Sequence, residues 1–356
     1  MRRSILGCAA IGVAAALLGA PLAAGASPFL VQPYLQLGSA APAPDTLVLV
    51  WHGPDRDGAW SVQVRSRPGG AWGPPLAPAW TRVAVSGVAA HRVYRAVLRP
   101  LAPGARFTYR VNLDGRPVFQ SRARARKGPG QSLRVAVLGD LADGHAPSRA
   151  MAFQVWRQRP DLVVLPGDLV YPDGRISEYR AFFYPVFNAD RAGPDLGAPL
   201  LRSTLTGPAA GNRYVDQWMA RIWPVLERHR VDLVLTGHIH TYVRTRPLRF
   251  TPDPAGPAAL DPVTRQGQVT GRLGWGSAYD GRVRTRARGV IHIITGGGGA
   301  HLHLKGRAGE LRPMPCVARM ISREHSFSLV EVRGRRVVFR QLGLRGEELD
   351  RFVLTK

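Results

Sequence analysis

Cysteine and lysine are scarce in this chain of 356 residues. Cys8 and Cys316 are the two cysteines, which is too few for a disulfide framework or for a zinc site built from cysteines. Lysine accounts for three of the 49 basic residues, and the 24 acidic residues leave a formal net charge of +25. Because so strong a preference for arginine over lysine follows genome composition as readily as function, the charge favours acidic ligands in general without indicating a nucleic-acid partner.

Several sequence motifs of common enzyme classes are also missing. The chain contains no phosphate-binding loop ending in Gly-Lys, no Gly-x-Ser-x-Gly elbow and no Cys-x-x-Cys pair, so the enzyme classes marked by these motifs lack support. Disorder of the whole chain is excluded, because 45% of the residues are hydrophobic and 8% are aromatic. The 40 glycines and 30 prolines instead predict many turns and short strands.

The first 26 residues have the composition of an export signal. Arg2 and Arg3 form a positive start, an apolar stretch follows, and Ala24-Gly25-Ala26 is a small-x-small cleavage site. We expect cleavage before Ser27 and export to the periplasm or the extracellular space, with no stable membrane span afterwards. An uncleaved membrane anchor is the alternative, because the apolar run approaches the length that spans a bilayer.

Hydrophobic patterning divides the remainder of the chain into two domains. Residues 27–128 carry short strands, such as 47–51 and 107–111, separated by Gly/Pro turns, and predict a small β-sandwich domain. Residues 129–356 alternate apolar strands with helical stretches and predict a layered α/β domain. Residues 121–130 are polar and basic and suit the connection between them. In the second domain we expect strands at 135–138, 162–165, 231–235 and 290–294, helices at 148–159, 176–187 and 214–229, and β structure at 326–354.

Three of the buried strands are followed by glycine and a residue that can bind a metal. These motifs are Gly139-Asp140, Gly167-Asp168 and Gly237-His238-Ile239-His240. Ligands bind at the carboxyl ends of strands in α/β sheets, and glycine permits a tight turn there. Carboxylates and imidazoles at one sheet edge are the ligands that metal ions need. The sequence therefore predicts a metal site built from the ends of three strands.

These motifs resemble the calcineurin-like metallophosphoesterases. The longer runs Gly167–Tyr171 and Gly237–Thr245 resemble the purple acid phosphatase branch of that family. Pro33–Gly38 resembles the N-terminal domain of that branch, and Ile293–Ala300 resembles one of its C-terminal blocks. The resemblance covers nearly the whole mature chain. It implies an α/β protein with a fibronectin-III-like β-sandwich in the first domain and a layered α/β/β/α metallophosphoesterase domain in the second.

The resemblance also implies an acid-phosphatase-like enzyme that hydrolyses phosphate monoesters at a dinuclear metal centre. Asp140, Tyr171 and His240 match the ligands of one metal. Asp168 matches the carboxylate that bridges the two metals, and His238 matches a ligand of the second. In this family the ions are divalent or trivalent, with iron paired with iron, zinc or manganese, and a phenolate such as Tyr171 suits ferric iron. The alternative for Tyr171 is a ring packed under the sheet edge.

One block of the family pattern is missing. The family has a Gly-Asn-His motif between the second and third blocks, in which the asparagine binds the second metal and the histidine is the acid catalyst. Here no histidine lies between His145 and His229, and the one Gly-Asn pair ends at Asn212 and is followed by Arg213. We expect Asn212 to bind the second metal and Arg213 to bind phosphate. No residue is assigned as the acid catalyst, because arginine holds its proton too tightly.

Two functions therefore stay open. One is an exported metal-dependent phosphoesterase acting on a phosphate ester, with activity reduced or lost because an internal segment near residues 206–213 is absent. The other is a non-catalytic descendant that binds one metal or an acidic ligand, and His145, His301 and His303 are either substitute ligands or ordinary surface histidines. Alternating arginines at 122–126 and 282–288 favour anion binding if they lie on strands, with a solvated basic surface as the alternative. No aromatic residues alternate with them, so a specific nucleic-acid partner is not expected.

Overall fold

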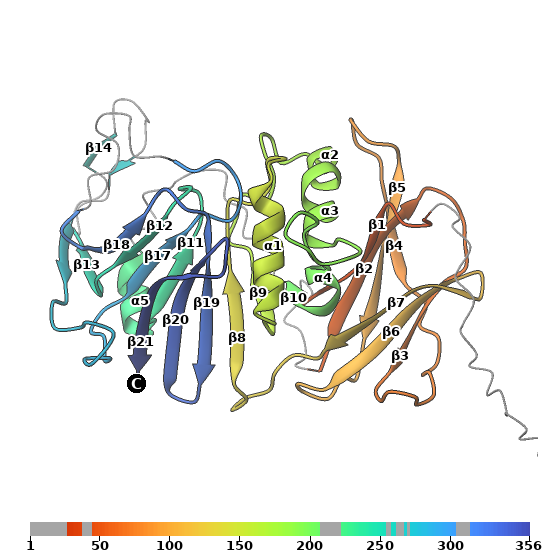
Figure 1. Cartoon of the computed structure of the whole chain (residues 1–356), viewed down its shortest axis with the longest axis horizontal. Coiled ribbons are helices and arrows are strands. Elements are labelled where there is room, and N and C mark those ends of the chain that lie inside the picture. The colour runs from red at the N-terminus through yellow and green to blue at the C-terminus, as the bar shows by residue number, and fades with distance from the viewer. Residues whose placement is uncertain are drawn as a thin grey trace, which may run out of the picture.

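The computed structural model contains many β-strands and few helices in the residues that it describes (Figure 1). It describes residues 27–37, 45–206, 222–253, 258–260, 267–268, 271–303 and 314–356. The predicted export signal and the candidate residues Asn212 and Arg213 lie outside these ranges. Within them, no helix is both long enough and apolar enough to cross a membrane.

The first seven strands form two sheets around one core. One sheet has the order β1 (Val31–Gln36), β2 (Leu47–Pro54), β5 (His91–Leu98), β4 (Ala79–Val83), and the other has the order β3 (Trp60–Arg65), β6 (Arg106–Leu113), β7 (Arg116–Arg124). Trp51 and Tyr109 come from opposite sheets and are fully buried in this core. Trp51 also stacks on Tyr94 with ring centroids 5.2 Å apart. The strands expected at 47–51 and 107–111 are confirmed.

The expected connection at 121–130 is wrong for its first four residues, which belong to β7. Ala123 is buried while Arg122 is exposed and Arg124 is half-buried, an alternation that suits a strand with one face against a core. The second arginine run, at 282–288, lies in a loop with its arginines exposed. Only the first run therefore places its guanidinium groups on one face of a strand.

A ten-stranded sheet continues from this region into the rest of the molecule (Figure 1). Its order is β21 (Glu348–Thr355), β20 (Arg336–Gly343), β19 (Ser326–Arg333), β8 (Leu133–Val137), β9 (Leu162–Val164), β10 (Leu205–Thr206), followed by β1, β2, β5 and β4. The two-residue strand β10 pairs in parallel with both β9 and β1 and so joins the two regions. The β structure expected at the C-terminus is confirmed.

Helices cover one face of β8, β9 and β19. They are α1 (Pro147–Arg157), α2 (Ile176–Glu178), the π-helical turn η1 (Tyr179–Phe183), α3 (Tyr184–Phe187) and α4 (Leu200–Ser203). The apolar face of α1, with Met151, Ala152 and Val155, packs in the same core as Ala136 and Leu138. The helices expected at 148–159 and 176–187 are confirmed, the second with a π-helical turn in its middle.

A second sheet packs on the opposite face of the ten-stranded sheet. Its order is β11 (Leu233–Thr236), β17 (Ile291–Thr295), β12 (Tyr242–Thr245), β18 (Val317–Ile321). Ile291 and Ile293 of this sheet share a core with Phe339 and Phe352 of the first. Beyond it lie α5 (Trp223–Arg228), β13 (Leu248–Pro252) paired with β16 (Gly271–Trp275), and β14 (Ala258–Leu260) paired with β15 (Gly267–Gln268). The described part of the helix expected at 214–229 is α5.

Candidate metal centre

The loops that follow β8, β9 and β17 are tied together by backbone hydrogen bonds. Strands β8 and β9 are parallel, as are β11 and β17, and the arrowheads of β8 and β11 point to the same end of the molecule (Figure 1). The N–H of Gly139 donates to the carbonyl of Thr295 at 2.9 Å, which connects the two sheets. The N–H of Leu141 donates to the carbonyl of Asp168 at 3.0 Å. The segment after β11 joins them, because the backbone N–H of His238 donates to Asp140 Oδ2 at 2.7 Å. The three predicted strand ends therefore meet at one edge.

Three donor atoms converge at this edge. The hydroxyl of Tyr171 lies 2.8 Å from Asp140 Oδ1, to which it donates, and 2.8 Å from His240 Nε2. His240 Nε2 lies 3.3 Å from the same carboxylate oxygen. The side chain of Asp140 is fully buried. Asp140, Tyr171 and His240, which were predicted as ligands of one metal, therefore lie in contact with one another.

Glycines leave room for the Asp140 carboxylate. Its Oδ2 accepts the backbone N–H of His238 at 2.7 Å. A Cβ atom would lie 2.8 Å from this oxygen if added at Gly237, and 2.5 Å if added at Gly296. Both approaches are closer than Cβ atoms make in proteins, so these positions require glycine. The glycine of the third motif, Gly237, thus has a steric reason, as does Gly296 after β17.

His240 is held by neighbours on the loop after β17. Its Nδ1 lies against the backbone carbonyl of His301, so Nδ1 carries a hydrogen, and Nε2 faces Asp140 and Tyr171. The ring of His303 stacks on that of His240 with centroids 4.2 Å apart, and its Nδ1 accepts the backbone N–H of His240 at 3.2 Å. Of the three histidines considered as substitute ligands, His303 thus has a packing contact at the centre.

Charge interactions shift the pKa values of two side chains at this centre. Burial, followed by the Asp140 and Asp168 carboxylates, raises the pKa of the Tyr171 phenol far above its usual range. Burial alone would lower the pKa of His240, but the hydrogen bond to Asp140 and the carbonyl of His301 raise it overall. The phenol stays protonated between two carboxylates unless a cation replaces its proton.

Asp168 and His238 form a second pair on the open side of this cluster. His238 Nδ1 lies 3.3 Å from Asp168 Oδ2, and the side chains are 68% and 39% exposed. Both groups are therefore accessible to a ligand from solvent, whereas Asp140 is not. The remaining residues predicted for this side, Asn212 and Arg213, are outside the described ranges.

A further group of possible metal ligands lies beside this centre. Asp143, His145 and His301 each offer a donor atom within 4.8 Å of the others. Asp143 contacts His145 Nδ1 at 2.9 Å and His301 Nδ1 at 2.7 Å. Burial alone would raise the pKa of Asp143, but hydrogen bonds from both histidines lower it. Asp143 was not among the residues predicted from the sequence, although its place three residues after Asp140 was a usable signal.

Three residues of the centre have a left-handed backbone. The φ angles are +60° at Asp140, +51° at Asp168 and +75° at His238. Residues with a Cβ seldom adopt this region, and each such residue costs about 1 kcal/mol or more unless its surroundings hold it. Strain of this kind gathers at functional sites, so its coincidence with the predicted ligands supports a function for all three.

Replacing His238 by glycine is expected to give a more stable protein than replacing it by alanine, by about 1 kcal/mol. Both changes remove the imidazole, but glycine accepts the φ of +75° without strain. Urea unfolding of the two variants measures the difference. A His238→Ala protein as stable as the His238→Gly protein would contradict the assignment of backbone strain.

Comparison with known proteins supports a metallophosphoesterase-like fold. No protein-family model matches the sequence, and no curated protein matches it. Among solved structures, the purple acid phosphatase PPD1 from yellow lupin (Lupinus luteus) seeds is similar with a TM-score of 0.63 and 14% identity, over 91% of this chain and 74% of that chain. The structure of PhoD is similar with a TM-score of 0.51 and 9% identity, over 94% and 90%. At such identities the likeness concerns the fold.

Proposed function

We propose that this protein is an exported, metal-dependent phosphoesterase that hydrolyses phosphate monoesters, as purple acid phosphatases do. In this proposal residues 1–26 are the export signal, and residues 27–128 form a fibronectin-III-like domain. Residues 129–356 form a layered α/β/β/α metallophosphoesterase domain that carries the active site. The fold similarity to the lupin phosphatase supports this organisation.

The observation that carries the proposal is the triangle of donor atoms from Tyr171, Asp140 and His240. Their separations of 2.8, 2.8 and 3.3 Å are close to the spacing of neighbouring ligands around an octahedral ion, roughly 3.0 Å for bonds of about 2.1 Å. A phenol, a carboxylate and an imidazole form a mixed oxygen and nitrogen donor set that suits a first-row transition metal. The residues present therefore fit the first metal of a dinuclear centre.

The chain's own groups have separate roles in this proposal. Asp140, Tyr171 and His240 would hold the first metal, and Asp168, His238 and Asn212 would hold the second. The carbonyl of His301 fixes the orientation of the His240 ring. Two bound metal ions, iron with iron, zinc or manganese, would bind the phosphate oxygens and lower the pKa of a bound water. The exposed pair Asp168 and His238 faces the solvent from which the substrate would come. Arg213 would bind the phosphate of the substrate.

Hydrolysis of 4-nitrophenyl phosphate tests this function. The purified mature chain, loaded with iron and zinc or with iron and manganese, is expected to release nitrophenol faster than its His238→Ala variant. Hydrolysis no faster than in that variant would overturn the proposal and favour a non-catalytic protein that binds one metal or an acidic ligand. Circular dichroism of both proteins checks that they are folded.

A further inference from the structure

A basic cavity lies between the sandwich strands and α1, far from the metal centre. Its volume is about 980 Å³, and Arg134 at the start of β8 and Asp161 just before β9 line it. Asp140 follows the other end of β8, six residues beyond Arg134. At about 3.3 Å per residue the two places are roughly 20 Å apart. The cavity is therefore a separate feature and not an extension of the candidate metal centre.

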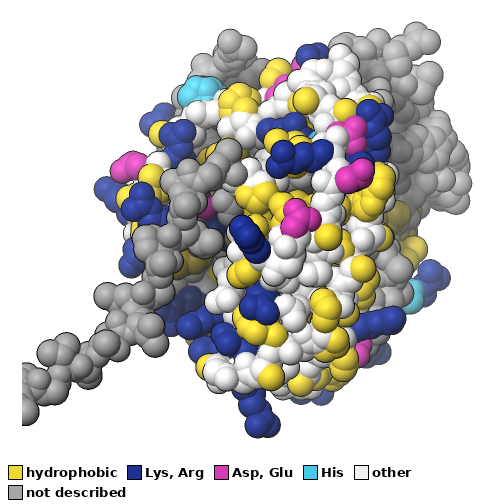
Figure 2. Space-filling view, turned by 90° about the vertical axis from the view of Figure 1, so that its right-hand side faces the viewer, with side chains coloured by type: hydrophobic (Ala, Val, Ile, Leu, Met, Phe, Trp, Pro, Cys, Tyr) yellow, Lys and Arg dark blue, Asp and Glu magenta, His cyan; other side chains and the backbone are white. Residues whose placement is uncertain are grey.

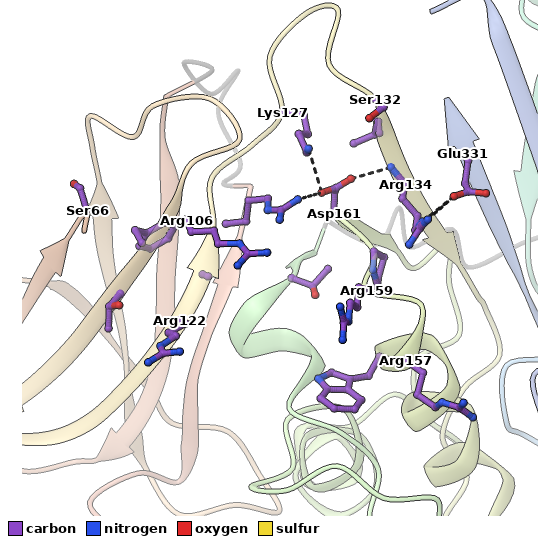
Figure 3. Close-up of a pocket in the computed structure, with 18 of the residues that line it drawn as sticks. Ser66, Arg106, Arg122, Lys127, Ser132, Arg134, Arg157, Arg159, Asp161 and Glu331 are labelled. Atoms are coloured by element: carbon purple, nitrogen blue, oxygen red, sulfur yellow. Dashed lines mark hydrogen bonds and ion pairs between the residues drawn. The ribbon is translucent and has the colours of Figure 1, made fainter. Parts of the chain in front are cut away.

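Positive charge dominates this cavity. Ten of its lining residues are arginine or lysine and two are acidic. Both acidic groups already have basic partners: Asp161 contacts Arg124 at 3.3 Å, and Glu331 contacts Arg134 at 2.6 Å. Figure 3 shows these ion pairs at one side of the cavity, with further arginines across from them. The acidic groups are too few to balance the remaining positive charge.

Seven of the lining arginines form no ion pair within the described residues, and three of them come from opposite sides of the cavity. Arg106 and Arg122 extend from β6 and β7, and Arg159 lies on the opposite side, after α1 (Figure 3). All three are exposed, and none forms an ion pair in the described structure. Arg106 is also directly opposite Arg124 in the β6–β7 ladder, where like charges are destabilising. An anion bound between the two sides would relieve this repulsion.

Basic side chains elsewhere on the surface lack this arrangement. Figure 2 shows Lys and Arg side chains scattered over the sandwich end of the molecule, among hydrophobic and neutral groups. Arg286 and Arg288 lie on the exposed loop at 282–288, outside the cavity. In the cavity the guanidinium groups come from two sides of a space that is open to solvent. Guanidinium groups match phosphate oxygens in pairs, so such a space suits several phosphoryl groups at once.

We propose that this cavity is an anion site for an oligophosphate, a compact ligand of three or more linked phosphoryl groups. A single phosphate is too small to contact arginines on both sides of a cavity of about 980 Å³. Nucleic acid is less suited, because single strands are held by bases stacked on aromatic rings. Trp156, at 37% exposure, is the one exposed aromatic side chain among the lining residues.

Calorimetric titration with sodium tripolyphosphate tests the proposal. The titrated protein carries Asp140→Asn and is freed of metal, so that neither hydrolysis nor chelation contributes heat. Binding is expected, together with a rise in melting temperature. Adding Arg106→Gln and Arg122→Gln is expected to weaken binding by about tenfold or more, because two charge-assisted contacts are lost. Adding Arg286→Gln and Arg288→Gln instead removes the same charge and is expected to leave binding unchanged.

Three results would overturn the proposal. In the first, the two pairs of substitutions weaken tripolyphosphate binding equally. In the second, orthophosphate binds as tightly as tripolyphosphate. In the third, a single-stranded oligonucleotide binds more tightly than tripolyphosphate. An Arg159→Gln variant repeats the test from the opposite side of the cavity if the double variant does not fold. Because the protein titrated lacks Asp140, the outcome is independent of whether the metal centre hydrolyses phosphate esters.

Discussion

Replacing Asp140 by asparagine is expected to abolish metal binding at the first site and to reduce hydrolysis of 4-nitrophenyl phosphate by more than about 100-fold. Replacing a residue that only supports a metal ligand already lowers metal affinity or activity by about 10–100-fold. The loss of a ligand itself should therefore lower activity by more than that. Asparagine keeps the size of the side chain, and its carbonyl can still accept the N–H of His238. The amide nitrogen then faces Tyr171 and His240 and cannot bind a cation.

Asp173→Asn is the matched control for this change. Asp173 lies two residues after Tyr171, is 49% exposed and pairs with Arg175 at 3.0 Å. Its replacement removes one carboxylate from the same region without touching the donor triangle, so activity and metal content are expected to be unchanged. If Asp140→Asn retained the activity of the Asp173→Asn control, Asp140 would not be a metal ligand.

Replacing Asp350 by alanine is expected to lower the free energy of unfolding by about 3–5 kcal/mol, because it leaves a buried charge without its partner. Asp350 lies on β21, in the ten-stranded sheet, and its Oδ2 accepts hydrogen bonds from Tyr242 and from Arg244 Nε, each at 2.7 Å. Both donors lie on β12, in the four-stranded sheet. The Asp350 and Arg244 side chains are 9% and 14% exposed. This one carboxylate therefore connects the two sheets that carry the metal-centre loops.

The stabilising contribution of Asp350 decreases at low pH. Burial alone would raise its pKa, but hydrogen bonds and charge from Arg244 and Tyr242 lower it below the ordinary value of 3.8. Its stabilising contribution is therefore complete above about pH 4 and is lost as the pH falls through the lowered value. Urea unfolding at pH 7 and pH 3 measures the free energy of unfolding of the native protein and of the Asp350→Ala variant. The difference between the two proteins should be smaller at pH 3.

Asp57→Ala provides the comparison for a surface ion pair. Asp57 contacts Arg92 at 2.8 Å, but its side chain is 97% exposed. Exposed pairs contribute about 0–1 kcal/mol. A cost for Asp350→Ala no larger than that for Asp57→Ala would show that the contact between the sheets does not stabilise the fold.

Local patterns made much of the candidate site predictable from the sequence. Each of Asp140, Asp168 and His238 directly follows a glycine after an apolar strand, and the parallel pairing of such strands brings their ends to one edge. Tyr171 was found because the run Gly167–Tyr171 resembles the purple acid phosphatase branch. Each of these signals spans only a few residues of the chain, so no knowledge of long-range contacts was needed to find it.

Features that depend on long-range pairing were not predictable in this way. The strand β10 has two residues, too few to show a periodic pattern, yet it joins the sandwich to the rest of the sheet. The contact between Asp143 and His301 links residues 158 positions apart. The basic cavity gathers Arg106, Arg122 and Arg159 from separate segments, and in the sequence these arginines resemble the many others of a basic chain.

The number of metal ions bound per chain is the direct test of the proposed dinuclear metal centre. The mature protein is saturated with iron and zinc, or with iron and manganese, separated from free ions, and analysed by plasma mass spectrometry against protein concentration. We expect about two metal ions per chain, and the loss of at least one in the Asp140→Asn variant. One ion or none in the native protein, or the same content in both proteins, would contradict this expectation.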